Sequence, residues 1–277
     1  MAFHAHPDDE VISTGGSLSR YAERGEQVVV VTATDGAEGE IHNYEDPDSI
    51  RPRLAEIRAE EVQAALALLG VKHHHFLGYR DSGMMGEDSN RHPESFWQAD
   101  LMEATGRLVR AIRRYQPEVM TIYDPFGGYG HPDHINVHRV GLAAYVGTAD
   151  LGRFPLEPGE EPWQPFKLYW AAWPRSRTRR MAELRFAAGK IDEEQYLRMQ
   201  ESGTPDEQVN ALLDVSDRVD TKIAALRAHR SQIPEDWFML TVPEESRPEL
   251  VGRESFVRVF SRVEVPASET DLFTGLR

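Results

Sequence analysis

The sequence contains no cysteine, and positively charged residues are scarce in it. Without cysteine the chain can form no disulfide, no thiolate metal site and no cysteine nucleophile, and this composition fits a cytoplasmic protein. The 31 lysines and arginines are outnumbered by 46 aspartates and glutamates, which gives a formal net charge of −15. So few basic residues leave no broad surface for neutralising phosphates, and we therefore expect no nucleic-acid partner.

Long apolar runs and several nucleotide or hydrolase motifs are also missing. No stretch approaches the ~18 consecutive apolar residues of a membrane span, and the first residues lack the basic-then-apolar pattern of a secretory signal. We therefore expect no membrane partner and a cytoplasmic location. The sequence has no GxGxxG or GxxxxGK[ST] phosphate loop, and it has no GxSxG elbow of a serine hydrolase.

Strand and helix patterns alternate along the 277 residues. The run QVVVVTAT at 27–34 is β-branched and apolar, as expected for a buried parallel strand. The alternation predicts an α/β fold: a Rossmann-like, mostly parallel sheet with helices on both faces. Further strands are expected at 2–5, 73–77, 118–123, 166–172 and 256–264, and helices at 14–24, 51–69, 96–115, 132–146 and 217–230.

The pattern predicts a single domain over residues 1–277, with an insertion in its C-terminal half. From about 150 to 215 a loop rich in proline, glycine and acids leads into a polar, charged and helical stretch. This stretch has no strong apolar stripe, so we expect a peripheral cap of helix and loop there.

Two clusters of histidine and aspartate follow predicted strands. One is HAHPDDE at 4–10, and the other lies within YDPFGGYGHPDHINVH at 123–138. The carboxyl ends of parallel strands meet at one edge of the sheet, which is where α/β proteins bind ligands. Imidazole and carboxylate groups suit zinc and neighbouring divalent ions. Together the two clusters predict a metal site.

The spacing within the clusters favours a catalytic metal site over a structural one. Pro7 turns the chain so that His6 and Asp9 can point at a common spot. In GHPDH, His131 and His134 are three residues apart and can share a helix face. Two histidines and one carboxylate leave coordination positions open for water and substrate, whereas structural zinc sites are closed. An unligated acid nearby would then serve as general base.

The remaining histidines are predicted to be structural or exposed. The run HHH at 73–75 cannot converge easily on one ion, because neighbouring strand residues point to opposite faces. We make the same prediction for His42, His92 and His138.

Three motifs resemble one known family. AHPDDE, GGYGHPDH and KIAALRAHRSQI are similar, in order and spacing, to the LmbE/PIG-L family of zinc-dependent N-acetylglucosamine deacetylases. The resemblance covers essentially the whole chain, and is best over 1–145 and 217–234. RDSGM at 80–84 and ETDLFTGL near the end look closest to the mycothiol branch, that is, the GlcNAc-inositol deacetylase and the mycothiol S-conjugate amidase. The resemblance implies a single LmbE-like metal-dependent deacetylase domain.

The resemblance also implies a metal centre and its catalytic groups. His6, Asp9 and His134 would hold one Zn²⁺ per chain, although Fe²⁺ or Co²⁺ also suits such a site. Asp8 would be the general base and His131 the acid or the oxyanion stabiliser. Either of these two groups could protonate the departing amine.

Other residues would bind the substrate or support the centre. By resemblance, the substrate-binding residues are Arg58, Asp81 and Tyr129. Arg58 could instead pair with Glu56 or Glu61 on its own helix, and Asp81 could cap a turn. Asp133 and His4 are expected to support the site from a second layer, Asp133 by orienting a ligand or His131.

The expected function is a metal-dependent amidohydrolase that removes the acyl group of an N-acyl glucosamine with a small polar aglycone such as inositol. One alternative is cleavage of a cysteinyl–glucosamine amide in a thiol conjugate. Alternatives of another class are a metal phosphoesterase, disfavoured by the few basic residues near the motifs, and a non-catalytic carbohydrate-binding protein, disfavoured by Asp8. The partner would be a small amino-sugar conjugate, and homo-oligomers remain possible.

Overall fold

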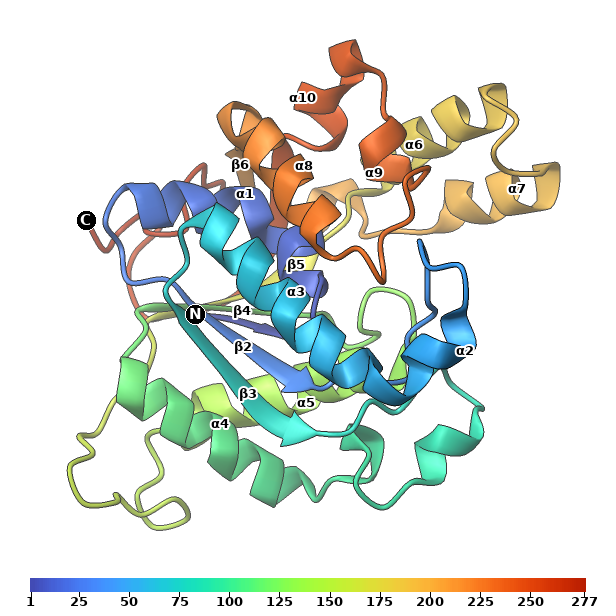
Figure 1. Ribbon diagram of the computed structural model, residues 1–277. Coiled ribbons are helices and arrows are strands. Elements are labelled where there is room, and N and C mark those ends of the chain that lie inside the picture. The colour runs from blue at the N-terminus through green and yellow to red at the C-terminus, as the bar shows by residue number, and fades with distance from the viewer.

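The computed structural model describes all of residues 1–277, and its centre is a seven-stranded sheet between two layers of helices (Figure 1). The strand order is β3-β2-β1-β4-β5-β7-β6. The first five strands in this order are parallel, while β7 runs antiparallel to both of its neighbours. The strands are β1 Ala2–His4, β2 Val29–Thr34, β3 His73–Tyr79, β4 Val119–Ile122, β5 Lys167–Ala172, β6 Ala211–Asp214 and β7 Arg253–Ser261.

Helices cover both faces of the sheet, with α1, α3 and α8 on one side and α4 and α5 on the other (Figure 1). None of the helices combines the length and the apolar character that crossing a membrane requires. The helices are α1 Asp9–Glu23, α2 Pro47–Ile50, α3 Leu54–Leu69, α4 Leu101–Tyr115, α5 Pro132–Gly147, α6 Arg175–Ala187, α7 Glu193–Glu201, α8 Val219–Ala228, α9 Phe238–Thr241 and α10 Arg247–Leu250.

Burial on two faces explains the apolar run of β2. Every residue of this strand is buried, and successive side chains enter different cores because a strand alternates its faces. Val29 and Val31 belong to the core under α4 and α5, whereas Val30 belongs to the core under α1, α3 and α8. The two polar residues of the strand, Thr32 and Thr34, are buried as well, and their hydroxyls bond to His74 and to the carbonyl oxygen of Ala5.

The predicted α/β fold is confirmed, with two local differences. Helix α1 begins at Asp9, not at residue 14 as expected, because the acids Asp9 and Glu10 occupy its first turn, where the helix dipole favours negative charge. Strand β6 was expected to be part of the cap, yet it is the edge strand beside β7.

The stretch 150–215 contributes both to the sheet and to a projection from it. Its strands β5 and β6 lie in the sheet, whereas the loop that precedes β5 and the segment between the two strands lie outside it. There α6 and α7 pack on each other and extend away from the body of the molecule (Figure 1, upper right).

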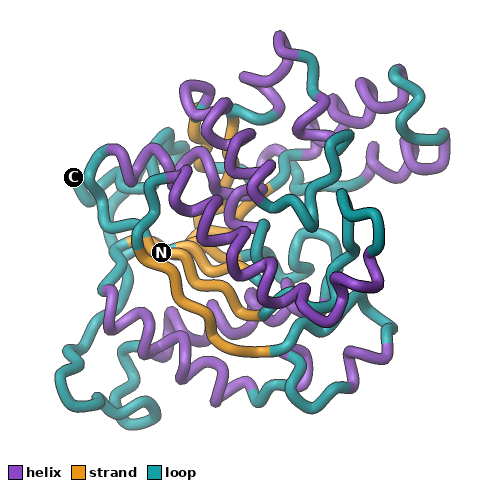
Figure 2. Tube along the Cα trace, viewed as in Figure 1, coloured by secondary structure: helices purple, strands orange, loops and turns teal.

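The loops that follow the parallel strands gather at one edge of the sheet (Figure 2). The histidines at 73–75 lie at the opposite end, where β3 begins; His74 bonds to the Thr32 hydroxyl at 2.9 Å and to the Gln63 amide. His138 is buried, and its Nδ1 lies 3.0 Å from the carbonyl oxygen of Tyr123. These histidines have packing roles, as predicted.

Candidate active site

Three donor atoms from two segments form an equilateral triangle. His6 Nδ1, Asp9 Oδ2 and His134 Nε2 each lie 3.3 Å from the other two. His6 and Asp9 follow β1, while His134 lies in the first turn of α5, which follows the neighbouring strand β4. All three residues are buried. The two sequence clusters therefore meet at the edge of the sheet.

The triangle has the dimensions of one face of a tetrahedral zinc site. Nitrogen and oxygen ligands bind zinc at about 2.0–2.2 Å, and tetrahedral angles then require donor atoms about 3.3–3.6 Å apart. The observed 3.3 Å separations meet this requirement without movement of any side chain. Two imidazoles and one carboxylate also form a donor set that zinc accepts.

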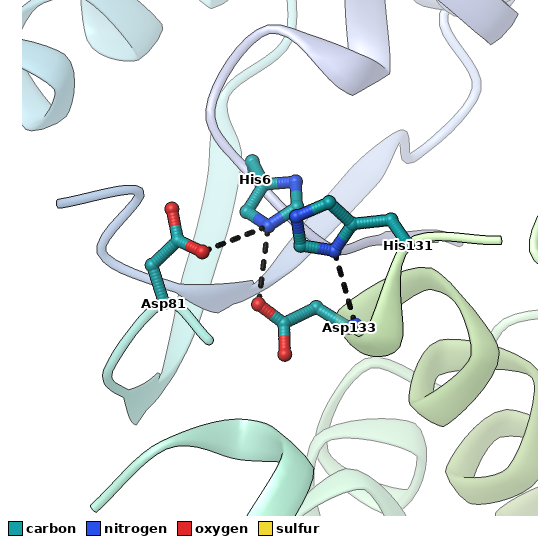
Figure 3. Close-up of side chains that lie close together, drawn as sticks. All are labelled: His6, Asp81, His131 and Asp133. Atoms are coloured by element: carbon teal, nitrogen blue, oxygen red, sulfur yellow. Dashed lines mark hydrogen bonds and ion pairs between the residues drawn. The ribbon is translucent and has the colours of Figure 1, made fainter. Parts of the chain in front are cut away.

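Asp133 fixes the orientation and the tautomer of His6. The Nε2 atom of His6 lies 3.2 Å from Asp133 Oδ2 and 3.5 Å from Asp81 Oδ1 (Figure 3). Because a carboxylate only accepts hydrogen bonds, Nε2 carries a proton, so Nδ1 is the nitrogen that could bind a metal. Asp133 is held in turn by the backbone N–H and the hydroxyl of Ser82.

A second group of potential ligands, drawn in Figure 3, lies beside the triangle: His6, Asp81, His131 and Asp133. The donor atoms of this group are already occupied by hydrogen bonds. Asp133 accepts from Ser82 and His6, Asp81 Oδ1 accepts from the backbone N–H of Gly83 at 2.9 Å, and His131 Nδ1 accepts from the backbone N–H of Asp133 at 3.1 Å. The triangle has fewer such hydrogen bonds, of which the main one is from the backbone N–H of His6 to Asp9 Oδ2 at 2.8 Å, so it is the better candidate for holding a metal.

His4 supports the triangle indirectly. Its Nδ1 lies 2.8 Å from the Tyr123 hydroxyl, and its Nε2 lies 3.1 Å from the Thr14 hydroxyl. The ring of Tyr123 stacks on His134, with ring centres 4.5 Å apart and planes 11° apart. Burial lowers the pKa of His4 to about 4, so this imidazole is neutral near pH 7.

Asp8 is not part of the triangle, and it lines the same cleft as the three triangle residues. Its carboxylate accepts a hydrogen bond from Arg58 Nη2 at 3.2 Å, and its side chain is 15% exposed. Burial raises the pKa of Asp8 to about 6, although the positive charge of Arg58 opposes the shift. A carboxyl group with a pKa near neutrality can both take up and release a proton, as general acid–base chemistry requires.

His131 presents a single hydrogen-bond donor. It is the N-cap residue of α5, and its Nδ1 accepts the hydrogen bond from the backbone of Asp133. Burial, together with the neighbouring His6 and His134, lowers the pKa of His131 to about 3. The ring is therefore neutral and carries its proton on Nε2.

The structure gives the three expected substrate-binding residues different surroundings. Arg58 pairs with neither Glu56 nor Glu61; it donates to the carbonyl oxygens of Gly36 and Pro7 and to the Asp8 carboxylate. The Asp81 carboxylate accepts from backbone N–H groups, including that of Gly83, so it does cap a turn.

Tyr129 is the most exposed of the three. Its side chain projects from a loop in which Gly127, Gly128 and Gly130 all have positive φ angles, and it is 57% exposed. Its hydroxyl lies 3.4 Å from His134 Nε2.

The triangle residues line one cleft of about 940 Å³, together with Asp8, Arg58, Asp81, Tyr129 and His131. The lining also includes residues of the 124–131 loop. Trp170, Trp173 and residues 202–205 after α7 complete it. The volume lies within the range of small-molecule sites, about 300–1,000 Å³.

Four buried residues of the site had no role in the sequence-based prediction: Glu10, Ser82, Tyr123 and His229. Glu10 belongs to HPDDE, where a third consecutive acid was a usable signal. His229 belongs to RAHRSQ, which was noted only as part of the resemblance. Ser82 and Tyr123 carry no signal of their own, because their roles depend on contacts with residues distant in the sequence.

Known proteins resemble the chain throughout its length. The family model PIG-L, described as GlcNAc-PI de-N-acetylase, matches residues 1–145. The chain is 42% identical to a 1D-myo-inositol 2-acetamido-2-deoxy-alpha-D-glucopyranoside deacetylase from Thermobispora bispora, over 99% of this chain and 97% of the relative. It is 44% identical to a protein of the same name from Thermomonospora curvata, over 83% of this chain and 79% of the relative.

Solved structures agree on the fold. The N,N'-diacetylchitobiose deacetylase from Pyrococcus horikoshii matches with a TM-score of 0.65 and 22% identity, over 93% of this chain and 82% of that one. The sequence matches confirm the resemblance inferred from the three motifs, and the structure match confirms the fold. The chain belongs to the PIG-L family of de-N-acetylases, enzymes that hydrolyse amides.

Proposed function

We propose that this protein is a zinc-dependent deacetylase that removes the acetyl group from the N-acetylglucosamine part of a GlcNAc-inositol conjugate. The observation that carries the proposal is the 3.3 Å triangle of His6, Asp9 and His134, with Asp8 and His131 beside it in the cleft. The names of the relatives that match nearly the whole chain support the inositol conjugate as substrate.

The metal would be held by His6, Asp9 and His134, one ion per chain. When bound, zinc supplies Lewis acidity, which polarises a carbonyl oxygen and lowers the pKa of water toward about 7. Fe²⁺ and Co²⁺ accept the same donor set, and the metal available to the protein then decides which one is bound.

Asp8 is the proton carrier in this proposal. Its carboxylate takes a proton from the attacking water, and the carboxylic acid formed gives this proton to the amine that leaves when the C–N bond breaks. The pKa of about 6 suits both transfers near pH 7. Because His131 is neutral and its Nδ1 is occupied by the Asp133 backbone N–H, it is the weaker candidate for protonating the amine.

His131 serves as a hydrogen-bond donor to the oxygen that becomes negative when water adds to the amide. A neutral Nε2–H group that is fixed in place stabilises such a charge without reorganising during the reaction. Asp133 connects this donor with the metal site: its backbone N–H fixes His131, and its carboxylate fixes His6.

The side chains of the cleft favour a substrate that carries a neutral polyol over one that carries a phosphate. Arg58 is the only lysine or arginine that lines it, and both of its Nη atoms already donate to Pro7, Asp8 and Gly36. A phosphoesterase would need free cationic donors at this place. The carboxylate of Asp81 and the hydroxyl of Tyr129, which also line the cleft, are suited to binding hydroxyls.

The proposal predicts acetate release from GlcNAc-inositol. We expect kcat/KM to exceed that for simple N-acetylglucosamine by about tenfold or more, because binding of the aglycone helps to hold the amide in place. Asp81→Ala should lower kcat/KM about tenfold on the conjugate and less on the simple sugar, with metal content unchanged. Steady-state assays that follow the release of both acetate and free amine test this prediction.

Asp88→Ala is the matched control, since Asp88 is an exposed acid of the same segment, paired only with Arg91. It should behave like the unmodified protein. Equal small losses for Asp81→Ala on both substrates would make Asp81 structural and the proposed binding site wrong. Amine release without acetate, from a cysteinyl-glucosamine conjugate, would favour the amidase alternative.

A second prediction concerns His131. His131→Ala should lower kcat about 10²–10³-fold, the usual loss for a single oxyanion donor, while metal content stays at one ion per chain. His131→Asn is the control for the helix cap, since asparagine still accepts from the helix N-terminus but is too short to replace the Nε2–H donor. Restoration of kcat by asparagine would reduce His131 to a cap.

A further inference from the structure

The backbone at Asp8 has a conformation that residues with a side chain rarely adopt. Its φ is 124° and its ψ is −33°, and Asp8 directly precedes α1. Such a conformation costs free energy, and it persists only where the surrounding contacts hold it in place. The groups that hold it therefore determine where the Asp8 carboxylate lies.

Two buried side chains clamp the peptide group between Pro7 and Asp8 from both ends. Arg58 Nη2 donates to the carbonyl oxygen of Pro7 at 2.5 Å, and Glu10 Oε2 accepts from the N–H of Asp8 at 2.9 Å. This one peptide group therefore has both of its polar atoms bound by charged side chains. Because rotation of this group is rotation about φ of Asp8, the clamp fixes the strained angle.

A third side chain, that of His229, holds Glu10 in place. It is the C-cap residue of α8, and its Nε2 lies 2.8 Å from Glu10 Oε1. Glu10 and His229 are both fully buried. Glu10 therefore uses one oxygen for the Asp8 backbone and the other for His229, so the position of α8 bears on the position of Asp8.

We propose that Glu10 and His229 are positioning residues for Asp8, and that they raise the deacetylation rate by holding its carboxylate in the reactive place. This inference rests on the role of Asp8 in the proposed function. The simpler explanation is an ordinary helix cap, since an acid in the first turn often reaches back to the N-cap N–H. A cap stabilises the fold, whereas a positioning pair also acts on kcat, and the two effects can be measured separately.

The test compares two amide side chains at residue 229. In His229→Gln the amide nitrogen reaches about as far as the histidine Nε2 and can donate to Glu10, whereas in His229→Asn it is one bond too short. We expect His229→Gln to keep kcat within about threefold and His229→Asn to lose about tenfold or more, because small displacements of a reacting group are costly. KM and metal content should match the unmodified protein in both.

A combination with Asp8→Ala shows whether the effect passes through Asp8. A residue that acts only by positioning Asp8 has nothing to position once that carboxylate is gone, so adding His229→Asn to Asp8→Ala should change the residual rate by less than about twofold. A further tenfold loss in this background would overturn the inference. So would equal kcat values for the glutamine and asparagine variants.

Failure of the inference is distinguishable from failure of the proposed function. If the unmodified protein releases acetate and Asp8→Ala abolishes the release, the proposed function stands whatever His229 does. If the asparagine variant fails to fold, Glu10→Ala and Glu10→Gln repeat the comparison, because glutamine still accepts from the Asp8 N–H and alanine does not. A lower kcat for alanine than for glutamine supports the inference, and equal values overturn it.

Discussion

Replacing Asp9 by alanine is expected to leave the purified protein with far less than one zinc ion per chain and to lower deacetylation more than about 10²-fold. Asp9 Oδ2 is one corner of the triangle and lies 3.3 Å from each of the two imidazole nitrogens. Its loss leaves two ligands, too few for a stable zinc site. His6→Ala and His134→Ala should have the same effect, since each removes one of the other two corners.

The measurement is metal content per chain, together with circular dichroism and a melting curve to establish that the variants fold. His75→Ala is the matched control, because it removes a histidine from the run in β3, outside the triangle. It should retain one ion per chain. Full occupancy in the Asp9, His6 and His134 variants would refute the assignment of the ligands.

Replacing Asp8 by alanine should have the opposite combination of effects: metal retained and turnover lost. Asp8 contacts Arg58, whereas the corners of the triangle contact each other, so metal content should stay near one ion per chain. The loss in kcat should be about 10²–10⁴-fold, the usual range for a general acid–base group. Steady-state kinetics and metal analysis on the same preparation test both parts.

Asp8→Asn separates chemistry from shape. Asparagine can still accept from Arg58 and tolerates positive φ better than alanine, yet it cannot take a proton at neutral pH. It should therefore be as inactive as Asp8→Ala. If the Asp8 variants lose metal while Asp9→Ala keeps it, the roles of the two aspartates are the reverse of those proposed.

The meeting of the two histidine–aspartate clusters could be anticipated from sequence because the position of each cluster is set locally. His6 and Asp9 lie in one short turn after β1, and His134 lies in the first turn of α5. Adjacent parallel strands then bring the two turns together at the carboxyl edge of the sheet. Short-range spacing and one topological rule were sufficient to bring the two clusters together, whereas the choice of His6, Asp9 and His134 as ligands came from the family resemblance.

The surroundings of Asp8 could not be anticipated in the same way. Arg58 was expected to bind substrate or to pair within α3, but it reaches the loop after β1 because Gly36 leaves room for it. A Cβ atom at Gly36, whose φ is 68°, would lie 2.6 Å from the guanidinium. The bond between Glu10 and His229 joins residues 219 positions apart, so it depends on how α8 packs on α1. No pattern of spacing reports such a contact.

Titration of metal-free protein with zinc, with acetate release from GlcNAc-inositol as the readout, tests the proposed function most directly. The account predicts no release without metal, then a rate that rises in proportion to added zinc and levels off at one equivalent per chain. Asp9→Ala should give no such rise, and Asp8→Ala should bind one equivalent of zinc without releasing acetate. Acetate release at full rate from the metal-free protein, or no release at any zinc concentration, would contradict the account.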